Sequence, residues 1–78
     1  MWTVYILKCS DGTYYTGCTN NIEDRLIRHG KGMVHYTKDK LPVVLITQII
    51  FNEKHKAYDF EKYLKSGSGT AFRNKRLV

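Results

Sequence analysis

Two positions of the helix expected within Tyr14–Gly30 carry ionisable side chains where a helix usually carries apolar ones. Arg25 and His29 share a helical face with Ile22 and Leu26, because positions i, i+3, i+4 and i+7 point the same way at about 100° per residue. Burying a guanidinium without a partner is costly, so either its head reaches solvent or the face opens onto a cationic site beside a tyrosine-bearing strand. Taken alone, this helix favours the first interpretation.

The segment Asn52–Ser66 repeats the arrangement with a carboxylate. Glu61 shares a helical face with Ala57, Phe60 and Leu64. A carboxylate in such a place is often paired with a basic side chain. It is also a suitable ligand for a hard divalent cation, which prefers carboxylate oxygen. Two helices that each direct an ionisable group inward favour a functional site.

The charge of the chain indicates a polyanionic partner. The 78 residues include 13 Lys and Arg against 7 Asp and Glu, a net charge of +6. Nucleic acid is the first candidate and an anionic membrane surface the second, although such an excess can also serve solubility alone. Without a run of 18 apolar residues or a signal-peptide pattern, we expect one cytoplasmic domain over residues 1–78 that does not enter a membrane. Cys9 and Cys18 fit neither a disulfide framework nor a common zinc spacing, and reduced thiols are expected.

The elements that must position these groups predict an α+β fold. Trp2–Cys9 and Thr13–Cys18 are rich in aromatic and β-branched residues, which indicates a hairpin of two strands. Val43–Phe51 is almost continuously apolar and is expected to be a third strand, covered on both faces and central in the sheet. Gly67–Gly69 is expected to be a flexible break before a short helix over Thr70–Arg76. The order β-β-α-β-α with this tail predicts a small three-stranded antiparallel sheet flanked by helices.

The hairpin loop decides which side chains share a face of the sheet. A three-residue loop with Gly12 in the left-handed conformation is a common solution. It places Leu7 opposite Tyr15 and Tyr5 opposite Gly17, so that the two tyrosines are diagonal neighbours on one face. Gly17 allows a close approach to the backbone, for example by a phosphate.

A polar, basic loop over Lys31–Leu41 is of the kind that either contacts a ligand or remains solvated. There Tyr36 suits stacking on a base, and the lysines around it suit phosphate contact. We expect Tyr14, Tyr58 and Tyr63 to fill the thin core instead. The residues expected to contact nucleic acid are Gly17, Lys31, Tyr36, Lys38, Lys65, Arg73, Lys75 and Arg76.

The ordered set of residues resembles the GIY-YIG nuclease family, in particular its small single-domain bacterial members. Thr3-Val4-Tyr5 stands at the first motif and Tyr15-Thr16-Gly17 at the second, followed by Arg25, by His29 one turn later, and by Glu61 in the second helix. The resemblance covers essentially the whole chain. Thr3 and Thr16 replace the family's Gly and Ile, and Asn74 is the only late candidate for an asparagine that many members carry.

The resemblance implies hydrolysis of phosphodiester bonds in DNA, with branched and single-stranded forms among the candidate substrates. Glu61 would hold one divalent cation, Mg²⁺ or Mn²⁺, and Arg25 would stabilise negative charge on the phosphate. Tyr15 is the preferred base and Tyr5 its hydrogen-bonding partner, while His29 would assist proton transfer or orient a tyrosine. A phenol with a pKa near 10 needs a neighbouring cation to act as a base at neutral pH.

Two other functions are compatible with the same residues. In the first, the chain is a non-catalytic module that grips nucleic acid through its basic face. In the second, it is a protein-interaction domain in which Arg25 and Glu61 form a purely structural ion pair. The nuclease is preferred, then the binding module, then the interaction domain.

Overall fold

The computed structural model describes all 78 residues. Three strands and three helices follow one another in the order expected from the sequence. They are β1 (Trp2–Lys8), β2 (Tyr14–Thr19), α1 (Ile22–Gly30), β3 (Val44–Phe51), α2 (Lys54–Leu64) and α3 (Gly67–Arg76). The α+β class and the three-stranded antiparallel sheet are therefore confirmed. No helix is long and apolar enough to cross a bilayer.

The strand order is β2-β1-β3, which corrects one expectation. The apolar run of Val44–Phe51 predicted a central strand, yet β1 is central and β3 lies at an edge. Along β3 half-buried and exposed residues alternate, with Val44, Ile46 and Ile50 exposed. A strand with one solvated face can carry apolar residues on both faces, so the continuous run did not distinguish an edge from a centre.

The β1–β2 hairpin has the expected register. Leu7 pairs with Tyr15 and Tyr5 with Gly17, both antiparallel. Gly12 has φ +86°, the left-handed conformation that a three-residue loop requires. The hairpin thus places Tyr5 and Tyr15 on the same face of the sheet, with their ring centroids 6.2 Å apart.

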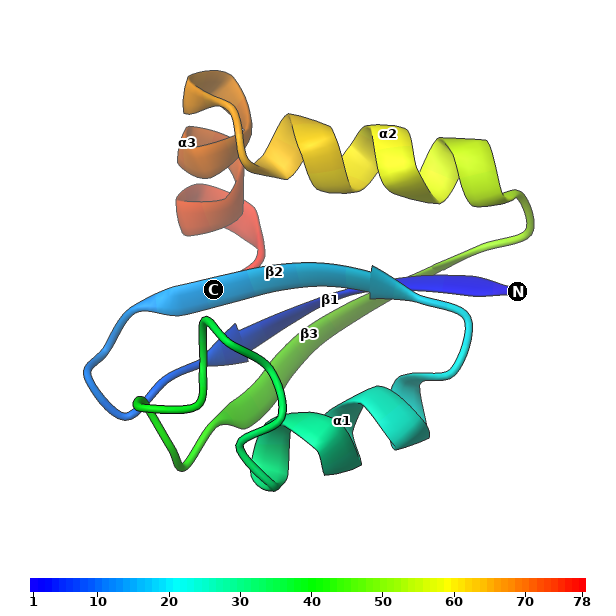
Figure 1. Ribbon diagram of the computed structural model, residues 1–78. Coiled ribbons are helices and arrows are strands. Elements are labelled where there is room, and N and C mark those ends of the chain that lie inside the picture. Colours follow the sequence, from blue (N-terminus) through cyan, green and yellow to red (C-terminus); the bar gives the residue numbers. More distant parts are fainter.

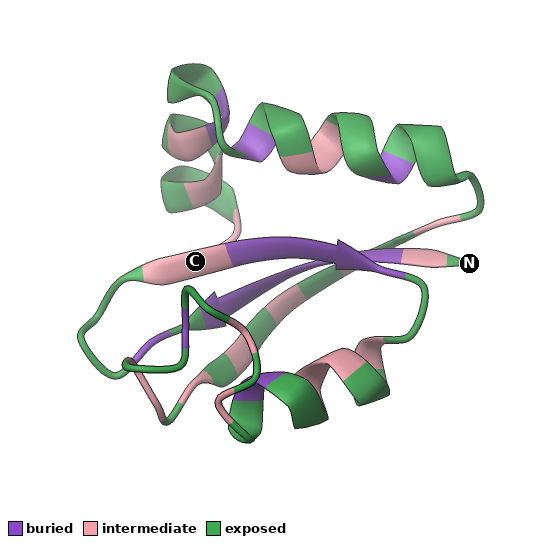
Figure 2. Cartoon of the chain, viewed as in Figure 1, coloured by how far each residue is buried: buried purple, intermediate pink, exposed green.

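Helices cover both faces of the sheet (Figure 1): α2 and α3 lie on one side and α1 on the other. The core between the sheet and α2 contains Val4, Ile6, Cys18, Ala57 and Leu64. The alternate side chains of β1, among them the fully buried Tyr5 and Leu7, face α1. Figure 2 shows burial concentrated in β1 and β2 and on the inner faces of the helices.

Helix boundaries differ from the sequence pattern in two places. The capping-box spacing of Asn20 and Glu23 indicates Asn20 as the N-cap of α1, but the N-cap is Asn21, whose side chain accepts from the Asp24 backbone N–H. Residues 67–69 are not a flexible break, because α3 already begins at Gly67, with Ser66 as its N-cap. Gly69 is buried against the Tyr63 carbonyl, and a Cβ there would lie 1.7 Å from that oxygen. The glycine therefore serves close packing between α2 and α3.

Two tyrosines expected in the core lie mostly at the surface. Tyr58 is 42% exposed and Tyr63 43% exposed, although each packs against another ring. Tyr14 is half-buried and packs against the core as expected. In so thin a domain the outer faces of α2 have no further layer to cover them.

Candidate active site

Tyr5 lies across Gly17 of the neighbouring strand. A Cβ at position 17 would stand 2.4 Å from the Tyr5 hydroxyl oxygen and 2.5 Å from Cζ. Only glycine leaves room for this side chain, because real Cβ contacts are not that short. The close approach that Gly17 permits is made in this structure by a phenol. Through it, β1 and β2 together fix the position of the Tyr5 hydroxyl.

A chain of buried polar groups extends from that hydroxyl into α1 and beyond. Tyr5 Oη lies 3.0 Å from His29 Nε2, and His29 Nδ1 lies 2.7 Å from Thr37 Oγ1. Tyr5, His29 and Thr37 are each 0% exposed. Burial, and then the charge of Arg25, lowers the pKa of His29, so the imidazole is neutral at neutral pH.

Tyr15 lies on the outer side of this chain. Its ring meets the His29 ring edge-on, with centroids 5.0 Å apart. On its other side the Tyr15 ring packs against the Tyr36 ring, with the ring centroids 5.4 Å apart. The Lys40 ammonium lies 3.9 Å from the centre of the Tyr36 ring. The basic loop is therefore packed onto the site through its aromatic residue. Tyr15 is half-buried, whereas Tyr5 is fully buried.

The charges of Arg25 and Glu61 both act on Tyr5. Burial raises the pKa of Tyr5 well above its usual value; Tyr15 and Glu61 add to this, while the charge and hydrogen bonding of Arg25 oppose it. Cys18 responds in the same way, since burial and Glu61 raise its pKa and Arg25 lowers it. Arg25 on α1 and Glu61 on α2 thus flank one region of β2 from opposite faces of the sheet.

Glu61 is ion-paired with Lys65 one turn along α2. The Lys65 Nζ to Glu61 Oε2 distance is 3.2 Å, and the two side chains are 55% and 17% exposed. The structure contains no ion pair between Arg25 and Glu61. The contact on which the interaction-domain alternative depends is therefore missing. Lys65 places a cation beside the Glu61 carboxylate.

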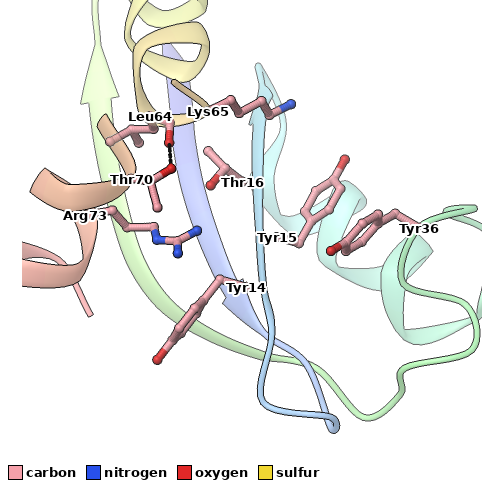
Figure 3. A pocket seen from close by; sticks show the side chains of 8 residues that line it. All are labelled: Tyr14, Tyr15, Thr16, Tyr36, Leu64, Lys65, Thr70 and Arg73. Atoms are coloured by element: carbon pink, nitrogen blue, oxygen red, sulfur yellow. Dashed lines mark hydrogen bonds between the residues drawn. The ribbon is translucent and has the colours of Figure 1, made fainter. Parts of the chain in front are cut away.

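A hollow of about 310 Å³ opens beside these groups, over the outer edge of β2. Figure 3 shows Tyr15 and Tyr36 on one side of the strand and Tyr14, Leu64, Thr70 and Arg73 on the other. The Arg73 guanidinium lies 4.9 Å from the centre of the Tyr14 ring. Aromatic faces and cations line the hollow together, which suits a ligand with both flat rings and negative charge.

The other expected contact residues are more scattered. Lys31 and Lys38 are exposed at the start and middle of the loop after α1, and Lys75 and Arg76 are exposed on α3. Asn74 accepts from Arg73 at 3.1 and 3.0 Å. Lys65, Tyr36 and Arg73 line the hollow, whereas these four outer cations do not.

The acid groups near the site suit only one kind of metal. There is no cluster of three or more His, Cys, Asp or Glu side chains that could enclose an ion. Glu61 is a single, partly exposed carboxylate that is not among the residues lining the hollow. This donor set fits a cation that keeps most of its waters and takes one carboxylate oxygen, as Mg²⁺ does, and does not fit a tetrahedral zinc site.

Sequence patterns did not identify Thr37. It is the only buried residue of the loop between α1 and β3, where a threonine among lysines carries no periodic signal. Its only recognisable feature is that it adjoins Tyr36, which was expected to stack. The partner of Glu61 could have been found, because Lys65 stands at i+4 on the same helix.

The fold and the arrangement of these side chains define a small nuclease-type domain. The sequence model of the GIY-YIG catalytic domain matches residues 1–76, and the chain belongs to the GIY-YIG family. This membership supports a nuclease-family function with nucleic acid as substrate.

Within this family the chain is similar to UPF0213 proteins of bacteria. One from Staphylococcus haemolyticus is 46% identical over 67 residues, which covers 83% of this chain and 80% of that protein. One from Nitratidesulfovibrio vulgaris is 41% identical over 66 residues, but the match covers only 60% of its length. The solution NMR structure of a UPF0213 protein from Bacillus halodurans matches 96% of this chain and 84% of that one, with 32% identity and a TM-score of 0.60.

Proposed function

We propose that the chain is a metal-dependent endonuclease that hydrolyses phosphodiester bonds of DNA. The observation that carries the proposal is the packing of Tyr5, Tyr15 and a neutral His29 against one another, within reach of the charges of Arg25 and Glu61 and beside a basic, aromatic hollow. These groups come from β1, β2, α1 and α2, and packing alone does not require them to meet.

Tyr15 is the group best placed to take a proton from the attacking water. Its ring lines the hollow, where a phosphate can reach it, while Tyr5 is sealed and its raised pKa keeps it protonated. Tyr5 therefore acts as a hydrogen-bond donor and a fixed partner within the site. His29 holds the Tyr5 hydroxyl through Nε2.

Arg25 stabilises the negative charge that develops on the phosphate. It is half-buried beside Tyr5, its guanidinium cannot be deprotonated, and no carboxylate neutralises it. Because a preformed donor in a partly dry site needs no reorganisation during the reaction, removing it costs on the order of 10²–10³ in rate.

Glu61 would hold one Mg²⁺ or Mn²⁺, which supplies Lewis-acid polarisation of a phosphate oxygen when bound. Its carboxylate has one partner, Lys65, and that contact is largely exposed and easily exchanged. Lys65 and Arg73 would contact neighbouring phosphates, and Tyr36 would stack on a base.

Cleavage of labelled DNA in Mg²⁺, Mn²⁺ or EDTA tests this proposal, with duplex, single-stranded and branched substrates compared. The variant Glu61→Gln should lose cleavage at least 10²-fold while its salt-sensitive binding remains. Glu53→Gln is the matched control, because it removes the same charge from the exposed N-cap of the same helix.

Three outcomes contradict the proposal. Binding that weakens steeply with salt, but without products in any metal, would identify the non-catalytic module. Cleavage that persists in EDTA would remove the metal from the reaction. Cleavage of RNA but not DNA would leave the assignment of the site intact and would show that the substrate is RNA.

A further inference from the structure

The hydroxyl of Thr37 holds the far side of the His29 ring. We propose that Thr37 is a positioning residue, whose hydroxyl accepts the Nδ1 proton of His29 and thereby makes Nε2 the acceptor for the Tyr5 hydroxyl proton. Its consequence for catalysis rests on the proposed nuclease function, but the assignment of the protons does not. Thr37 does not line the hollow.

The surroundings of Tyr5 decide between the two neutral tautomers of His29. A neutral imidazole donates from one nitrogen and accepts at the other, and a guanidinium only donates. The charge of Arg25 acts on the Tyr5 hydroxyl, and a cation repels the hydroxyl proton. The proton of Tyr5 therefore points away from Arg25, and the only other partner of that hydroxyl is His29 Nε2. Nε2 must then be the accepting nitrogen, so Nδ1 carries the proton.

Thr37 is built to receive that proton. Its oxygen lies 2.7 Å from Nδ1, the ring and the threonine are both 0% exposed, and no buried side-chain polar atom lacks a partner. Without this acceptor the buried Nδ1–H of His29 would have no hydrogen-bond partner. The opposite tautomer or a rotated ring would then be favoured. Because Tyr15 meets the same ring edge-on, a rotation would disturb both tyrosines.

The backbone of the loop holds Thr37 in place. The Thr37 N–H donates to the Val34 carbonyl, and the Thr37 carbonyl accepts from the Lys40 N–H, at 3.2 and 2.9 Å. Lys40 in turn accepts from the Ser10 N–H with its carbonyl, at 2.9 Å. Through these bonds the tip of the β1–β2 hairpin is joined to the loop that sets the His29 tautomer.

Long-range ¹H–¹⁵N NMR of ¹⁵N-labelled protein tests the assignment directly. In the wild type, the Nδ1 of His29 should show the shift of a protonated nitrogen and Nε2 that of an unprotonated one. Thr37→Val should abolish that pattern, and Thr37→Ser should keep it. The exposed His35 and His55 serve as internal references for averaged tautomers. Thr47→Val is the matched control, because it removes a hydroxyl that bonds only to the Leu77 carbonyl.

Kinetics supply the second readout. Thr37→Val should lower kcat on the order of 10–100-fold, the range found when the hydrogen-bond partner that orients a metal-bound histidine is removed, and leave KM nearly unchanged. Thr37→Ser should recover most of the loss and Thr47→Val should show none. Amide spectra of each variant establish that it is folded.

Two results overturn the inference: an Nε2–H tautomer in the wild type, or an unchanged Nδ1–H tautomer in folded Thr37→Val. A wild type that cleaves nothing would refute the proposed function instead, and the NMR arm would still decide the role of Thr37.

Discussion

The phenol of Tyr5 occupies the space that a side chain at position 17 would need: a Cβ on Gly17 would stand 2.4 Å from its oxygen. Tyr5 cannot move aside, because its hydroxyl is bonded to His29 and its ring is fully buried. The second motif therefore ends in glycine to admit the tyrosine of the first.

Gly17→Ala should consequently destabilise the protein by about 1–3 kcal/mol, the usual cost of overpacking, and should reduce cleavage by displacing Tyr5. Urea unfolding measures the first effect. Gly30→Ala is the control, since a Cβ there meets nothing within 4 Å and alanine favours the helix. Equal stability of the two variants would show that Tyr5 yields easily.

Stability should fall in mild acid because of His29. Its pKa is lowered in the folded protein, by burial first and then by Arg25, but keeps its ordinary value near 6.5 in the unfolded chain. Below that value the unfolded state binds a proton that the folded state does not. The free energy of unfolding therefore decreases as the pH drops from about 7 to 5, by at most about 1.4 kcal/mol per pH unit for this group.

Urea unfolding across that range should show a shallower pH dependence for His29→Gln than for the wild type. His35→Gln should follow the wild type, because His35 is exposed. Identical pH profiles of the wild type and His29→Gln would be incompatible with the lowered pKa.

Lys65→Gln should strengthen the binding of Mn²⁺ by removing the ammonium that pairs with Glu61. An exposed ion pair contributes about 0.2–1 kcal/mol, so the affinity should rise about 1.5–5-fold and the free energy of unfolding should fall by no more than 1 kcal/mol. Isothermal titration calorimetry measures the affinity. Lys62→Gln, on the same helix but without such a pair, should bind as the wild type does; weaker binding by Lys65→Gln would exclude competition at Glu61.

Tyr36→Ala should weaken binding to a short oligonucleotide without changing its salt dependence. Loss of one stacking platform costs about 1–3 kcal/mol, and the exposed face of Tyr36 carries no charge. Arg73→Gln should instead reduce the slope of log K against log salt by about 1, as expected for the loss of one phosphate contact. Fluorescence anisotropy over a salt series separates the two, and a reduced slope in Tyr36→Ala would show that its main effect is on Lys40.

Loop chemistry and helical spacing were sufficient to predict the hairpin register and the inward faces of the two helices. Gly12 fixed the loop and hence the pairing of Tyr5 with Gly17, and Arg25, His29 and Glu61 all lie on the half-buried faces that their spacing indicated. The prediction that β3 is central was wrong, because the sequences of β1 and β3 are both apolar and only tertiary packing decides which of them lies in the centre of the sheet. Thr37 was not predicted, because its role depends on the conformation of the loop, which no periodic sequence pattern encodes.

Cys18 faces α2 yet responds to Arg25 of α1, and Tyr5 faces α1 yet responds to Glu61 of α2. The charges of Arg25 and Glu61 thus act on side chains of both faces of the sheet, each as a smaller cause than burial. Substitutions that move Arg25 or Glu61 on one face should therefore also shift the pKa of a side chain on the other face. Compensating mutations for a damaged site are to be sought on the face opposite the damage as well as on the same one.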